Sequence, residues 1–100
     1  MLQHNVYFYL KEDLSEEEIK KFETGLKSLM EIKNMVSGFV GKPAETADRP
    51  VVDKKYSFAL STTFHNVQQH DAYQDHPTHH KFINTCKEFW KEVKVFDVEY

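Results

Sequence analysis

The first strand of this chain constrains the fold most, because neither of its two faces carries a charge. Residues 2–10 alternate, with one face made of Leu2, His4, Val6, Phe8 and Leu10 and the other of Gln3, Asn5, Tyr7 and Tyr9. This period of two, with aromatic and β-branched residues, is typical of a β-strand. A strand with two uncharged faces needs cover on both sides, so we expect it inside a layered structure.

Helix and strand signals follow in a regular order. Residues 14–33 predict a helix, because Ser15 and Glu18 form a capping box and apolar residues, from Ile19 onward, recur at spacings of three and four. Residues 35–42 and 55–64 predict two strands joined by a long loop. Residues 66–75 and 77–90 predict two helical segments divided at Pro77, and residues 91–100 predict a closing strand.

The order strand–helix–strand–strand–helix–strand is that of the ferredoxin-like split βαβ fold. We therefore predict an α+β protein, βαββαβ, with a four-stranded antiparallel sheet and both helical regions on one face. The open face would carry residues without charge: Asn5, Tyr7, Tyr9, Ser57, Ala59, Ser61 and Thr63. Such a face predicts a homodimer through the sheet, and the alternative is a polar face exposed to water.

Length and charge exclude several classes of protein. We expect residues 1–100 to form a single domain. The net charge of −3 gives no basic surface for nucleic acid. No apolar run approaches the ~20 residues of a membrane span, so no membrane partner is expected. The N-terminus does not read as a signal peptide and Cys86 is the only cysteine, which together favour a cytoplasmic protein.

The stretch YQDHPTHHKF, residues 73–82, concentrates groups that can exchange protons. The spacing of Phe82, Cys86 and Phe89 predicts that His79 points toward the core and His80 toward solvent. Tyr73 shares a helix face with Val67 and His70, and His4 shares a strand face with Val6 and Phe8. We therefore expect His4, Tyr73 and His79 to converge between the helices and the sheet.

Four segments of the chain together resemble one known family. The opening HNVYFYLK, the GK pair at 41–42, the pattern Tyr73-x-x-His76-Pro77-x-His79 and the closing KVFDVEY are similar to the stress-responsive A/B barrel domain, Dabb. The resemblance implies a dimeric α+β barrel in which two four-stranded sheets pack face to face. It also implies a mixed function, since the family includes stress-induced plant proteins, a plant polyketide cyclase and many members without an assigned activity.

The cyclase performs a cofactor-free aldol condensation, and the resemblance carries its catalytic tyrosine and histidine onto Tyr73 and His79. A pocket histidine on its first strand corresponds to His4. Two positions depart from the cyclase: a pocket histidine is replaced by Phe58, and a small glycine-containing stretch by His80, Lys81 and Phe82. These larger side chains narrow and reshape any pocket.

Several functions follow from these residues. The leading interpretation is a Dabb-type barrel of unassigned or stress-related role, with a small pocket for an apolar ligand. We expect its walls to be His4, Val6, Phe8, Phe22, Leu26, Phe58, Leu60, Tyr73, His76, His79, Phe82 and Trp90. The alternative is a cofactor-free lyase or isomerase, with His79 as the base and Tyr73 as the hydrogen-bond donor. In a purely structural role the two side chains would instead bond each other or the backbone, and an assembly module is a third possibility.

A metal site is the weaker hypothesis. His76 and His80 have the i, i+4 spacing of zinc-binding helices, but Pro77 interrupts the turn and the glutamate of the metalloprotease motif is absent. His4, His76 and His79 could form a three-histidine site. We expect neither a metal nor a cofactor, and we expect Cys86 to be a small core residue.

Overall fold

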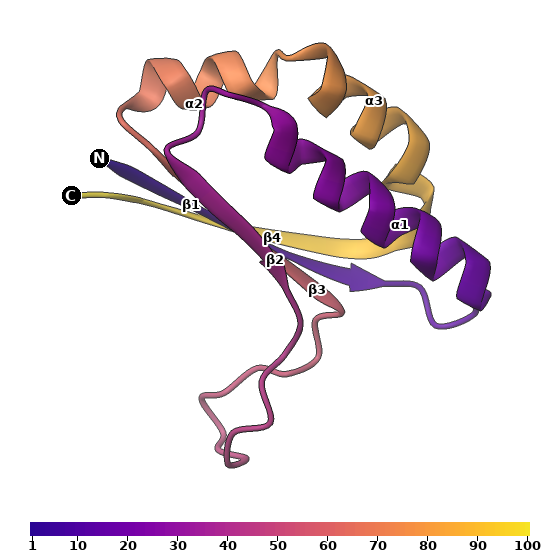
Figure 1. The fold of residues 1–100 in the computed structure, drawn as a ribbon. Coiled ribbons are helices and arrows are strands. Elements are labelled where there is room, and N and C mark those ends of the chain that lie inside the picture. The colour runs from indigo at the N-terminus through magenta and orange to yellow at the C-terminus, as the bar shows by residue number, and fades with distance from the viewer.

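The computed structural model describes residues 1–100 and has two layers, a sheet and a layer of helices (Figure 1). The strands are β1 (Leu2–Leu10), β2 (Ser37–Gly41), β3 (Phe58–Phe64) and β4 (Trp90–Glu99). The helices are α1 (Glu16–Ser28), α2 (Val67–Gln74) and α3 (Pro77–Cys86), with short 3-10 turns η1 (Leu29–Glu31) and η2 (Lys87–Phe89). The sheet is antiparallel with the order β2-β3-β1-β4, and the predicted ferredoxin-like fold is confirmed.

The helices begin and end where local chemistry requires. At the start of α1 the Ser15 amide donates to Glu18 Oε1 at 2.9 Å, and the Glu18 amide donates to Ser15 Oγ at 3.1 Å. Asn66 caps α2 by accepting from the Gln69 amide at 2.9 Å. Pro77 is the first residue of α3, as its fixed φ and missing N–H favour. Trp90, expected at the end of this helix, instead begins β4.

The register of the sheet decides which side chains meet beneath the helices. In the pairing of β1 with β3, Val6 lies opposite Leu60 and Phe8 opposite Phe58. In the pairing of β1 with β4, His4 lies opposite Asp97, although 93 residues separate them. Because side chains alternate along a strand, His4 and Asp97 both face the helices.

The helix layer packs closely at α1. Phe22, Leu26 and Leu29 have no exposed surface. A Cβ atom added at Gly25 would lie 2.9 Å from the sulfur of Cys86, so the glycine allows α1 and α3 to approach each other. Ile19, which the apolar spacing also places toward the core, is 38% exposed at the N-terminal end of α1.

The opposite face of the sheet has no helix over it (Figure 1). As predicted, β1 and β3 bring an uncharged row there, and β4 adds Glu92 and Lys94. The segment between β2 and β3 projects from this side, and its Asp53 accepts a hydrogen bond from the Tyr9 hydroxyl at 2.8 Å. None of the helices has the length and apolar character that crossing a membrane requires.

Candidate active site

A cavity of about 270 Å³ lies between the sheet and the layer formed by α2 and α3. Eight of the residues predicted as pocket walls line it: His4, Val6, Phe8, Leu60, Tyr73, His79, Phe82 and Trp90. Five further residues complete the lining: Leu29, Gln74, Ile83, Val93 and Val95. Ten of the thirteen are hydrophobic, so the cavity suits a small apolar ligand.

Four residues predicted as pocket walls lie elsewhere. Phe22 and Leu26 are fully buried in the core under α1, and Phe58 packs there with its ring centroid 5.6 Å from that of Phe22. The apolar stripe of the first helix correctly places Phe22 and Leu26 inside, but these side chains are packed in the core and do not line the cavity. His76 is the N-cap of α3, where its Nδ1 accepts a hydrogen bond from the Thr78 amide at 3.0 Å.

Tyr73 and His79 meet at the wall of the cavity. Their ring centroids are 5.0 Å apart and their planes cross at 75°, which is an edge-to-face contact. The Tyr73 hydroxyl is buried and has no hydrogen-bond partner. The hydroxyl therefore bonds neither His79 nor the backbone, the two partners that a purely structural role would give it. Burial raises the pKa of Tyr73, so its hydroxyl keeps its proton near neutral pH and is able to donate a hydrogen bond.

His79 is half-buried and His80 exposed, as the helix spacing predicts. Burial, with smaller contributions from the neighbouring His80, His4 and His70, lowers the pKa of His79 to about 4. The imidazole is therefore neutral at pH 7 and one of its nitrogens can accept a proton.

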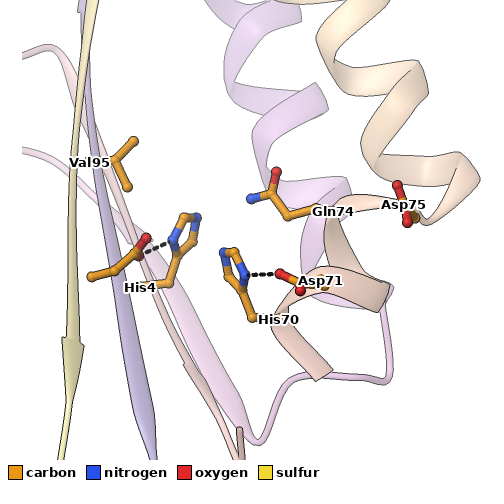
Figure 2. A pocket seen from close by; sticks show the side chains of 7 residues that line it. His4, His70, Asp71, Gln74, Asp75 and Val95 are labelled. Atoms are coloured by element: carbon orange, nitrogen blue, oxygen red, sulfur yellow. Dashed lines mark hydrogen bonds and ion pairs between the residues drawn. The ribbon is translucent and has the colours of Figure 1, made fainter. Parts of the chain in front are cut away.

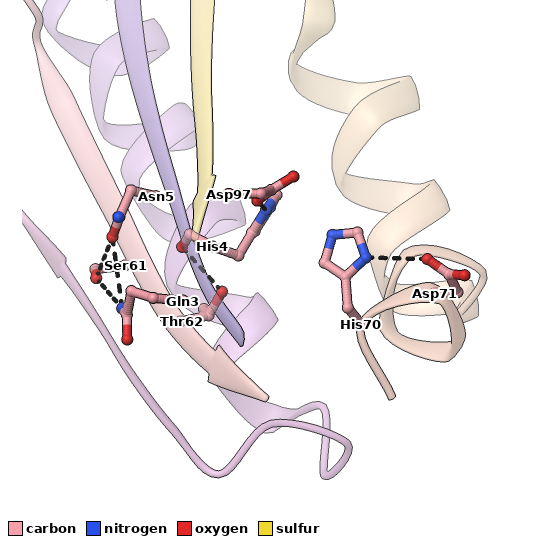
Figure 3. Close-up of polar contacts among 8 residues, drawn as sticks. All are labelled: Gln3, His4, Asn5, Ser61, Thr62, His70, Asp71 and Asp97. Carbon is pink, nitrogen blue, oxygen red and sulfur yellow. Dashed lines mark hydrogen bonds and ion pairs between the residues drawn. The ribbon is translucent and has the colours of Figure 1, made fainter. Parts of the chain in front are cut away.

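His4 closes the end of the cavity beneath α2. Its Nδ1 donates to Asp97 Oδ1 at 2.5 Å, and its side chain is 5% exposed while that of Asp97 is 46% exposed (Figure 3). Burial lowers the pKa of His4, and this effect outweighs the opposing influence of Asp97. The carboxylate holds the imidazole in one orientation and leaves its Nε2 without a proton.

His70 is a site residue that the sequence analysis does not select. Its Nδ1 lies 3.0 Å from Asp71 Oδ1, and its ring centroid lies 4.7 Å from that of His4. Together these side chains border an open cleft of about 570 Å³ with Gln74, Asp75, Val95 and Asp97 (Figure 2). The shared helix face of His70 and Tyr73 signals an inward orientation, but nothing local connects His70 with Asp97.

The fold and the cavity define the class of the molecule: a ferredoxin-like α+β protein with a small pocket between helices and sheet. Residues 2–100 match the family model for the stress responsive A/B barrel domain, Dabb. The chain belongs to this family, and the resemblance inferred from its motifs is confirmed. A sequence comparison with curated proteins gives no match.

Solved structures of the same fold include proteins with and without a known activity. A Dabb family protein from Mesorhizobium loti is 24% identical, with a TM-score of 0.77 over 99% of this chain and 95% of the other. A hydroxynitrile lyase from Passiflora edulis is 21% identical, with a TM-score of 0.78 over 97% and 90%. A dimeric ferredoxin-like protein of unknown function from Thermobifida fusca is 19% identical, with a TM-score of 0.77 over 99% and 90%.

Proposed function

We propose that this chain is a cofactor-free lyase or isomerase that acts on a small, mainly apolar carbonyl compound. The observation that carries the proposal is the Tyr73 hydroxyl, which is buried beside the cavity without a partner. A buried hydroxyl without a hydrogen bond costs about 1–3 kcal/mol. An oxygen atom of a bound ligand would remove that cost, whereas no group of the protein does.

The chemistry follows from the two side chains. The neutral His79 accepts a proton from a carbon next to a carbonyl group, and the electron pair of that bond moves onto the carbonyl oxygen as an enolate. Tyr73 donates a hydrogen bond to this oxygen as its charge develops. Where the enolate is conjugated with a C=C bond, return of the proton from His79 to the far carbon gives an isomerisation. Attack of the enolate carbon on a second carbonyl gives an alkoxide, and transfer of the same proton from His79 to that oxygen completes an aldol product.

The shape and lining of the cavity support the same substrate class. Phe8, Phe82 and Trp90 supply aromatic walls, with ring centroids between 5.3 and 6.0 Å apart. A volume of about 270 Å³ favours a small substrate. The name of the Passiflora edulis protein, a hydroxynitrile lyase, lends support to lyase chemistry on this fold.

The test begins with a thermal-shift screen of small β-keto compounds, polyketide-like compounds and hydroxynitriles. For any compound that binds and is converted, Tyr73→Phe should lower kcat by roughly 10²–10³-fold, the contribution of one oxyanion donor. Tyr100→Phe, which removes a hydroxyl from a residue 70% exposed at the end of the chain, is the matched control and should leave kcat unchanged. Equal turnover by Tyr73→Phe and the unmodified chain would contradict the proposed role.

We also infer that a second copy of the chain covers the open face of the sheet. Large apolar side chains lie exposed there, with Phe39 62%, Phe96 57% and Val98 51% exposed. Beside them a polar network is already satisfied, since Gln3 Nε2 donates to Ser61 Oγ at 2.6 Å and Ser61 Oγ donates to Asn5 Oδ1 at 2.7 Å. Polar groups bonded in this way can be buried against a partner without losing hydrogen bonds.

Replacing Tyr7 and Ala59 together with Glu would place charge in that interface. We expect this variant to sediment as a monomer or to unfold, because buried unpaired charges are strongly destabilising. Ala72→Glu, on the exposed side of α2, is the matched control and should leave the sedimentation unchanged. An unmodified chain that sediments as a monomer at micromolar concentration would exclude the dimer.

A further inference from the structure

Two histidines beneath α2 share an arrangement that the proposed proton transfer does not use. Each has a carboxylate at its Nδ1, since His4 bonds Asp97 at 2.5 Å and His70 bonds Asp71 at 3.0 Å. Histidines that bind metals in proteins are commonly held in this way, because a carboxylate at one nitrogen fixes the tautomer and turns the lone pair of the other toward the metal. The carboxylate of Asp71 therefore prepares the Nε2 atom of His70 as a ligand, while Asp97 fixes the orientation of His4 in the metal-free chain.

The second nitrogen of His70 has no other use in the structure. It is buried and has no hydrogen-bond partner. It faces the ring of His4 across the cleft, on the side away from Asp71 (Figures 2 and 3). A buried acceptor without a partner is unfavourable unless something binds to it.

We propose that His4, His70 and Asp97 form a binding site for a divalent cation of the zinc class. One potential ligand atom of each residue lies within 4.8 Å of those of the other two. Zinc bonds of about 2.0–2.1 Å place tetrahedral ligand atoms roughly 3.3 Å apart, so binding requires shifts of at most about 1.5 Å in these separations. The side chains of His70, 15% exposed, and Asp97, 46% exposed, both border the open cleft, so Asp97 has room to leave the Nδ1 of His4 and bind the ion itself.

The ligand chemistry selects the metal. Two imidazole nitrogens and one carboxylate oxygen suit zinc, nickel or copper, whereas calcium and magnesium prefer oxygen ligands alone. Three protein ligands leave the fourth tetrahedral position open to the cleft. This site differs from the histidine groupings suggested by the sequence, because His76 caps α3 and neither His79 nor His80 belongs to the cluster.

The site is separate from the proposed proton transfer, although His4, Gln74 and Val95 border both the cleft and the cavity. Neither Tyr73 nor His79 is a ligand. Zinc binding by Tyr73→Phe should therefore match that of the unmodified chain, whether or not this variant loses turnover. The two proposals can fail independently.

Calorimetric titration of the untagged chain with zinc chloride tests the site directly. We expect one ion per chain, with His70→Gln weakening the affinity by more than tenfold and Asp71→Asn weakening it by about tenfold, as removal of a supporting carboxylate does. The control variant combines His76→Gln with His80→Gln, and its affinity should stay within twofold of the unmodified chain. Visible absorption of bound cobalt, lost in His70→Gln, gives a second measurement of nitrogen ligation.

Two results would overturn the site. One is affinity unchanged in both His70→Gln and Asp71→Asn but lost in the control variant, which assigns the ion to His76 and His80 at the start of α3. The other is an absence of saturable zinc binding by the unmodified chain. Circular dichroism of each variant verifies its fold, and Asp71→Asn, an exposed position, provides the test if His70→Gln is unfolded.

Discussion

The two halves of the helix-covered face are built differently. Under α1 the interior is apolar and closed, with Phe22 and Leu26 without exposed surface. Under α2 and α3 the interior holds histidine and tyrosine side chains around a cavity, and polar atoms of Tyr73 and His70 are buried without partners. The same sheet thus supports a core on one side and a binding site on the other.

This difference indicates which half carries stability and which carries function. Buried apolar side chains stabilise the folded state, whereas each buried polar atom without a partner lowers that stability by about 1–3 kcal/mol. The half under α2 and α3 keeps two such atoms, so it is less stable than it would be with apolar side chains at these positions. Substitutions should therefore lower stability under α1 and change binding or pH response under α2 and α3.

The largest effect should follow from Phe22→Ala. This change empties a fully buried site in the closed half, and we expect it to lower the free energy of unfolding by about 3–5 kcal/mol. Ile19→Ala, on the same helix at 38% exposure, is the control and should cost much less. Urea denaturation measures both, and similar losses would mean that the closed half is no better packed than the surface of α1.

Gly25→Ala tests the close approach of α1 and α3. Alanine favours a helix over glycine by about 0.5–1 kcal/mol, but its Cβ would lie 2.9 Å from the sulfur of Cys86. Overpacking typically costs 1–3 kcal/mol, so we expect a net loss of stability. In a Cys86→Ala background the same change should become stabilising. If its sign is the same in both backgrounds, the sulfur does not limit the packing.

The half under α2 and α3 should make the stability of the molecule depend on pH. The pKa of His79 is lowered to about 4 in the folded state against 6.5 for the free side chain, so between these values the unfolded chain binds more protons. Stability should therefore fall as the pH drops from 6.5 toward 4, by less than about 1.4 kcal/mol per pH unit because His79 is only half-buried.

His79→Gln should reduce this slope. Urea midpoints measured between pH 7 and pH 4 compare the variant with the unmodified chain, and the difference between them removes the contribution of the carboxylates. Parallel curves would show that His79 is as accessible to protons in the folded chain as in the unfolded one.

Tyr73→Phe should have the smallest effect on stability. Its hydroxyl has no partner, so its loss leaves no group unbonded, and we expect stability to stay within about 1 kcal/mol or to rise. Urea denaturation of this variant and of Phe22→Ala measures the loss of stability in each half. Both changes are at aromatic residues with no exposed surface. A loss of 1–3 kcal/mol would indicate a hidden hydrogen-bond partner and a structural role.

Features that depend on neighbouring residues could be predicted from the sequence. The alternation of residues 2–10, the cap at Ser15 and the break at Pro77 determine the elements and the direction of their side chains, because each is local. The same periodicity predicted that Tyr73 and His79 point inward while His80 points outward.

The tertiary structure alone decided the distances between layers. Periodicity gives the direction of a side chain but not the separation of the opposite layer, so Phe22, Leu26 and Phe58 were expected at a pocket that exists only under α2 and α3. His4 meets Asp97 through a strand register that joins residues 93 positions apart, and His70 joins them only once α2 packs over the sheet. No local pattern encodes such contacts, because they depend on how distant segments dock.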